Sequence, residues 1–101
     1  MSNTHTLEVA MFRLKEGTDR EAFLRASDAT MSALKSYSGF IRREVHTSEE
    51  GQWLDLIYWT SLEEAMSAAE QIMSDPACHP FLEMIDMPSL TMLHLHPVRT
   101  Y

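Results

Sequence analysis

The sequence has few of the features that confine a chain to a membrane, an oxidising compartment or a phosphate ligand. It contains one cysteine, Cys78, which excludes an internal disulfide, and three glycines that lie too far apart for a phosphate-binding loop. No apolar run approaches the roughly 18 residues of a membrane-spanning helix. The first residues also lack the basic and apolar segments of a secretory signal. We therefore expect a cytoplasmic protein with no membrane association.

Positive charge is also scarce. Eight Lys and Arg residues stand against fifteen Asp and Glu, giving a formal net charge of −7. This balance argues against nucleic acid as a partner, because phosphates require a basic surface. The remaining composition, 45% hydrophobic and 23% charged, is typical of a globular protein. A chain of 101 residues predicts a single domain over 1–101.

Four segments have the pattern of β-strands. Residues Thr6–Leu14 alternate with apolar side chains on both faces, which is typical of a central strand covered on both sides. Phe40–His46 and Trp53–Thr60 predict two strands joined by a turn that carries Gly51. The last strand is expected over Leu90–His96, ending before Pro97.

Two capping boxes predict the starts of the main helices. The first, Thr18–Glu21, has Thr18 as the capping residue and opens a helix that ends near Tyr37. The second, Ser61–Glu64, opens a helix whose apolar residues recur at helical spacing as far as Met73. Beyond it, Pro76 favours a short third helix, and His79, just before Pro80, should lie at a break between helical turns.

The order β-α-β-β-α-β predicts an α+β, ferredoxin-like fold, in which a four-stranded antiparallel sheet carries both main helices on one face. Alternation then leaves an apolar set on the other face, so we expect a second copy to cover it and form a homodimer. The residues expected on this uncovered face are Leu7, Val9, Met11, Phe40, Trp53, Ile57, Trp59, Leu90 and Met92.

Polar side chains are expected on the same uncovered face. With regular register this set comprises Arg13, Arg42, Glu44, Asp55 and His94, which favours an ion-pair network between subunits, with an anionic-substrate site at Arg42 as the alternative. His94 and His96 share a strand face at a spacing that can chelate a metal. Two ligands are fewer than zinc sites use, so we predict no metal.

The chain resembles the dimeric α/β-barrel superfamily, specifically its antibiotic-biosynthesis-monooxygenase-like domain. The resemblance rests on Gly39-Phe40, on the segment from Tyr58 to Ala65 that joins strand to helix, and on 75–81 with His79. It implies paired ferredoxin-like subunits, each with a pocket between sheet and helices. Haem-degrading members of the superfamily use a first-strand asparagine and a second-helix tryptophan, and residues 7–14 and 62–73 contain neither.

The function predicted from these features is a small-molecule-binding homodimer that acts as a cofactor-independent monooxygenase on an aromatic or quinol-type substrate. His79 is the predicted catalytic base, because imidazole exchanges protons near neutral pH. The expected substrate-binding residues are Trp59, Tyr58, Arg42, Phe12 and Met66. Two alternatives stay open: a non-catalytic ligand-binding or stress-related protein, and an isomerase or lyase. For His79 and Trp59 the competing interpretations are a surface histidine and a packing aromatic.

Overall fold

The computed structural model describes residues 5–101 and confirms the ferredoxin-like order of elements. Within those residues, no helix is both long and apolar enough to cross a membrane. The elements are β1 (Thr6–Leu14), α1 (Arg20–Ala29), α2 (Met31–Leu34), β2 (Phe40–Thr47), β3 (Trp53–Trp59), α3 (Leu62–Ser74), the 3-10 turn η1 (Pro76–Cys78), α4 (His79–Glu83) and β4 (Ile85–Leu95).

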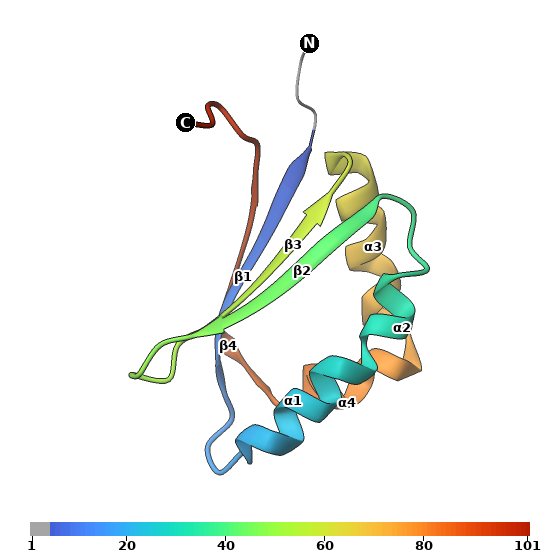
Figure 1. Cartoon of the computed structure of the whole chain (residues 1–101). Helices are drawn as coiled ribbons and strands as arrows, with labels where there is room; N and C mark the ends of the chain where they lie inside the picture. The colour runs from blue at the N-terminus through green and yellow to red at the C-terminus, as the bar shows by residue number, and fades with distance from the viewer. Residues whose placement is uncertain (1–4) are drawn as a thin grey trace.

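The strands form one antiparallel sheet in the order β2-β3-β1-β4, so β2 and β4 are its edges. All the helices lie on one side of this sheet, and the other side is bare (Figure 1). We call the helix-covered side the inner face and the bare side the outer face.

The cap of α1 lies one residue after the predicted one, and the cap of α3 lies where it was predicted. Asp19, one residue after the predicted Thr18, caps α1, and its Oδ2 accepts a hydrogen bond from the Ala22 N–H at 3.0 Å. The predicted helix to Tyr37 is interrupted at Thr30, whose hydroxyl donates to the Ser27 carbonyl at 2.6 Å. A hydroxyl that bonds back to its own helix in this way favours a bend. The second cap is confirmed, because Ser61 Oγ accepts from the Glu64 N–H at 3.2 Å.

The turn into β2 depends on Gly39. Its φ of +85° lies in the left-handed region that favours glycine. A Cβ at this position would lie 2.5 Å from Glu64 Cδ, so the site also lacks space for a side chain. The Glu64 carboxyl bonds the hydroxyls of Ser38, Thr60 and Ser61, which joins this turn to the start of α3. These bonds lower the pKa of Glu64.

Two hydrophobic clusters lie between the sheet and the helices. One is mainly aromatic: Phe23 contacts both Trp53 (ring centroids 4.9 Å apart) and Phe81 (5.1 Å) under α1 and α4. The other lies under α3, where Trp59 is fully buried and Phe40 packs against its ring edge-on at 5.8 Å.

The predicted distribution of side chains between the two faces is partly wrong. Trp53, Asp55, Ile57 and Trp59 do share one face of β3, but it is the inner face. The physical reason is register, because Val9 pairs with Leu56 and a shift of one residue exchanges the faces of a strand. The outer face carries Leu7, Val9, Met11, Leu54, Leu56, Tyr58, Leu93 and Leu95, while Phe40, Leu90 and Met92 also lie on the inner side with the helices.

The same difference in register places the residues of the predicted polar cluster on two different faces of the sheet. Arg42 and Glu44 lie on the outer face, 3.4 Å apart between Nη2 and Oε2, whereas Asp55 and His94 lie on the inner face. Arg13 instead donates from Nη1 to the Glu50 carbonyl at 2.8 Å. The pairing of β1 with β4 shifts between Met11 and Arg13, where an irregularity separates two paired stretches, and β4 begins at Ile85, earlier than predicted.

Candidate functional site

A cavity of about 300 Å³ lies between the inner face and the helices. Its wall takes side chains from both hydrophobic clusters, so it occupies the space between them. The volume is at the lower end for small-molecule sites. The lining residues are Glu8, Ala10, Phe12, Thr30, Leu34, Arg43, Asp55, Ile57, Ala69, Ile72, Met73, Cys78, Phe81, Leu82, Ile85, Met87, Leu90 and Met92.

Methionines form the exposed part of this wall. Met73 at the end of α3 is 63% exposed, and Met87 and Met92 on the edge strand β4 are 42% and 41% exposed. The cavity therefore reaches the surface between α3 and β4. Flexible thioether side chains adapt to ligands of varied shape, which suits an entrance for an apolar molecule.

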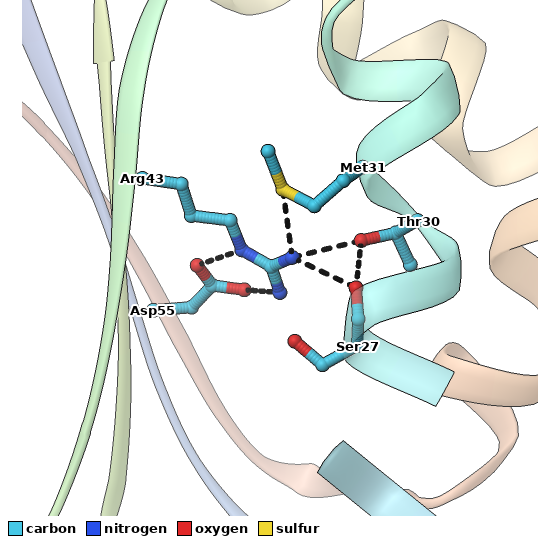
Figure 2. Close-up of polar contacts among 5 residues, drawn as sticks. All are labelled: Ser27, Thr30, Met31, Arg43 and Asp55. Atoms are coloured by element: carbon cyan, nitrogen blue, oxygen red, sulfur yellow. Dashed lines mark hydrogen bonds and ion pairs between the residues drawn. The ribbon is translucent and has the colours of Figure 1, made fainter. Parts of the chain in front are cut away.

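The strongest polar interaction in the wall is a buried ion pair between Arg43 and Asp55. Arg43 Nε and Nη2 each donate to one carboxylate oxygen at 2.8 Å (Figure 2), and the two side chains are only 4% and 8% exposed. Nη1 continues to the Thr30 hydroxyl at 2.8 Å and the Ser27 carbonyl at 3.1 Å. The Arg43 guanidinium thus links β2 and β3 to the point where α1 ends and α2 begins. The Asp55 carboxylate compensates its positive charge.

Glu8, in the centre of β1, is the second buried acid of the wall. It is 5% exposed, and burial raises the pKa of its carboxyl to about 7, with the nearby Asp55 charge acting in the same direction. The Trp59 indole and the Arg43 charge lower this pKa, but by less. A carboxyl in this environment takes up and releases a proton near neutral pH, which an ordinary glutamate does not.

Three buried polar atoms around this carboxyl have no hydrogen-bond partner among the described residues: Glu8 Oε1, Trp59 Nε1 and His94 Nε2. The Trp59 N–H is close enough to Glu8 to influence its pKa, but not at hydrogen-bonding geometry. His94 Nε2 lies 3.7 Å from Glu8 Oε1, which is longer than a hydrogen bond. Unsatisfied buried polar groups are rare and costly, and each calls for an explanation such as a catalytic role.

Cys78, the single cysteine, also faces the cavity. It is buried, and burial raises the pKa of its thiol, with the charge of nearby Asp75 adding to the effect. A thiol with a raised pKa is a poor nucleophile, because little of it is thiolate at neutral pH.

The residues predicted for the site are spread over three regions. Phe12 lines the cavity, and Trp59 is buried behind its wall in the cluster under α3. Tyr58 and Arg42 lie together on the outer face, with the guanidinium 4.3 Å from the ring centroid. Met66 is exposed on α3.

His79 lies at the junction between η1 and α4, as the break before Pro80 predicted. Its side chain is exposed and borders a shallow depression formed with Lys15, Leu82, Glu83 and Met87. Leu82 and Met87 also line the cavity, so the two hollows share part of one wall. His79 itself is not among the residues that line the cavity.

Sequence reasoning did not single out Glu8 or Arg43, the two charges that matter most in the wall. A signal was present for each: Glu8 interrupts the apolar run from Leu7 to Phe12, and the neighbours Arg42 and Arg43 must face opposite ways. His94 was considered as a metal ligand or a member of an ion-pair network. Over residues 5–101, no three His, Cys, Asp or Glu side chains are grouped in a way that could hold a metal ion.

Fold and cavity together define a class of protein: a ferredoxin-like α+β domain with a small-molecule-sized cavity between its sheet and its helices. The sequence matches no protein-family model and no curated protein. Solved structures do share the fold along almost the whole chain.

One is a mutant form of SnoaB, a cofactor-independent oxygenase from Streptomyces nogalater, with a TM-score of 0.78, 13% identity and 96% of each chain covered. A Bordetella bronchiseptica protein, provisionally assigned as an antibiotic biosynthesis monooxygenase, gives a TM-score of 0.78 at 17% identity, covering 95% of this chain and 99% of that one. A nipsnap family protein of unknown function from Agrobacterium tumefaciens gives 0.72 at 20% identity, covering 100% and 95%. The chain therefore has the antibiotic-biosynthesis-monooxygenase-like fold.

Proposed function

We propose that this protein binds a small, largely apolar aromatic molecule with an ionisable hydroxyl group, and acts on it as a cofactor-independent monooxygenase. The observation that carries the proposal is the cavity itself, whose apolar wall is interrupted by a compensated ion pair and one uncompensated carboxyl, Glu8. Such a wall favours a flat apolar ligand with a single polar group. The shared fold with SnoaB, an oxygenase described as cofactor-independent, supports the choice of chemistry.

The proposed reaction needs no group beyond substrate and dioxygen. A quinol gives up a hydroxyl proton to a base, and the resulting anion reduces dioxygen. One oxygen atom replaces a ring hydrogen to form a hydroxyquinone, and the other leaves as water. The substrate supplies all four electrons, two from oxidation of the quinol and two from hydroxylation of the ring carbon. The protein has to provide a water-poor cavity and a proton acceptor.

Glu8 and His79 are the two candidates for the proton acceptor. Glu8 faces the cavity, and its pKa of about 7 suits a base at neutral pH. His79 borders the neighbouring depression and reaches a substrate only if that substrate extends past Leu82 and Met87. We favour Glu8, with Phe12 as an aromatic wall of the binding site and Trp59 behind it.

Oxygen uptake with naphthohydroquinone as the probe tests the proposal, measured against the spontaneous oxidation rate. We expect uptake above this background, with one atom of isotopically labelled dioxygen in the hydroxynaphthoquinone product. Glu8→Gln should abolish the enzymatic rate and His79→Ala should leave it unchanged. The reverse pattern would make His79 the base. Saturable binding without uptake or isomerised product would instead support a non-catalytic binder.

We also propose that a second copy of the chain covers the outer face. The apolar side chains of this face belong to three strands, and Leu93 and Leu95 are 41% and 44% exposed. Arg42 and Glu44 lie on the same face, so two copies can exchange ion pairs across a twofold axis. Sedimentation at micromolar concentration should give a dimer, and Leu56→Asp, at the centre of the face, should give a folded monomer. A monomeric wild-type protein would refute this assembly.

A further inference from the structure

We infer that His94 is the group through which Glu8 exchanges its proton with solvent, so that the pair Glu8–His94 forms a proton path from the cavity to the surface. The inference rests on the proposed function, because it assigns a route to the proton that the base takes from substrate. It names His94 as a residue that acts through Glu8 and does not touch the substrate.

A buried base needs such a route. Glu8 is 5% exposed and faces a largely apolar cavity, so a bound ligand would separate it from water on that side. The hydroxyquinone is a vinylogous acid and leaves as its anion at neutral pH, so each turnover leaves one net proton on the carboxyl, and that proton must depart before the next substrate reacts. The exit therefore has to lie on the side of Glu8 away from the ligand.

The ladder between β1 and β4 places His94 beside Glu8, and His94 is not among the residues that line the cavity. Glu8 and His94 are direct partners in this ladder, and His94 Nε2 is 3.7 Å from Glu8 Oε1. Both atoms are buried and neither has a hydrogen-bond partner among residues 5–101. A shortening of about 1 Å would give an ordinary hydrogen bond between them.

His94 also reaches water, which the buried side chains of Asp55, Arg43 and Trp59 do not. Its side chain is 21% exposed although its Nε2 is buried, because β4 is an edge strand. Imidazole accepts a proton at one nitrogen and releases one from the other, so it can transfer a proton between its two edges.

The remaining groups that face Glu8 have other roles. Asp55 on β3 and Arg43 on β2 are paired to each other and nearly fully buried. Trp59 on β3 is fully buried and its indole only donates. On the helix side, Cys78 of η1 is the titratable group in the cavity wall and is buried as well, while α3 contributes Ala69, Ile72 and Met73. Among these described groups, His94 alone combines proton exchange with exposure.

A pH-jump experiment on the ligand-free protein tests the path without any substrate. The chain has two tryptophans, so a Trp53→Phe background leaves Trp59, next to Glu8, as the fluorescent probe. A jump from about pH 6 to about pH 8 should change this fluorescence as Glu8 ionises, and Glu8→Gln should remove the change. In His94→Ala the change should be on the order of tenfold slower or more, and added imidazole should restore its rate.

His96→Ala is the matched control, because His96 lies two residues after His94, just past the end of β4, and its Nδ1 is 3.4 Å from the Thr6 hydroxyl. It should leave the rate unchanged. His94→Gln, which keeps a polar side chain of similar length without a titratable ring, replaces His94→Ala if that variant does not fold. Equal rates in wild type and a folded His94 variant would overturn the inference, as would the absence of any Glu8-dependent change.

The experiment separates this inference from the proposed function. A protein that shows the His94-dependent change but no oxygen uptake has the proton path and a different reaction. If the protein oxidises naphthohydroquinone and His94→Ala leaves kcat unchanged at every buffer concentration, the proposed reaction is correct and the proton leaves by a different path.

Discussion

Ionisation of Glu8 should make the folded protein less stable as the pH rises. Its pKa is about 7 in the folded state against an ordinary value of 4.5, so between these pH values the folded state holds a proton that the unfolded state has lost. Stability therefore falls as the pH rises from 4.5 through 7. Each pKa unit corresponds to about 1.4 kcal/mol, which gives a total loss of about 3 kcal/mol. Burial, the main cause of the shift, is nearly complete for this side chain.

Glu8→Gln removes this dependence, because an amide of the same shape does not ionise. The free energy of unfolding should be measured by urea denaturation at fixed protein concentration, from about pH 5 to about pH 8, for wild type and variant. The variant should gain about 2.5 kcal/mol relative to wild type across this range, because part of the loss in wild type has already occurred at pH 5. All other titrating groups are common to both proteins and cancel in the difference, apart from any coupling to Glu8.

The control is Glu16→Gln, which changes an exposed carboxyl in the turn after β1. Its difference from wild type should be the same at every pH. If Glu8→Gln also gave a pH-independent difference, Glu8 would ionise as an ordinary carboxyl. The assignment of a cavity base, and the proton path built on it, would then be wrong.

Two further predictions concern the structure around the site. Arg43→Met should lower the free energy of unfolding by about 3–5 kcal/mol in urea denaturation, because it leaves the Asp55 carboxylate buried without its partner. Combining it with Asp55→Asn should restore part of the loss. If Arg43→Met alone were as stable as wild type, the stabilising role of the pair would be refuted. Gly17→Ala should cost about 1–2 kcal/mol through its positive φ alone. Gly39→Ala should cost a further 1–3 kcal/mol or so, because its Cβ also meets the Glu64 carboxyl; equal losses at the two glycines would show that this carboxyl moves aside freely.

The elements could be predicted from the sequence because their signals are local. The Ser61 cap, the positive-φ Gly39 and the alternation in β3 each depend on residues a few positions apart. The interruption at Thr30 has a local contribution, the bond from the Thr30 hydroxyl to the Ser27 carbonyl, and a long-range one, because Arg43 from a later strand donates to the same two groups. The long-range contribution could not be predicted from residues a few positions apart.

The site was harder to predict because it depends on which face of each strand meets the helices. Alternation divides β3 correctly into Leu56 and Tyr58 on one side and Ile57 and Trp59 on the other, yet gives no pairing register with β1. The error of one residue put Asp55 and His94 on the outer face beside Arg42, which does lie there. It therefore directed attention away from Arg43, the partner of Asp55 in the cavity wall.

The two acids of the cavity differ in a way that a purely structural role does not explain. Asp55 receives two hydrogen bonds from one guanidinium, whereas Glu8, with Asp55 close enough to raise its pKa, has an oxygen without a hydrogen-bond partner among the described residues. An apolar residue at position 8 would fill the same place between Trp59 and His94 without a desolvation cost of about 3 kcal/mol at neutral pH. Proteins tolerate such a cost mainly where it serves activity. The compensated pair holds the strands to the helices, and the uncompensated carboxyl is the group available for a ligand.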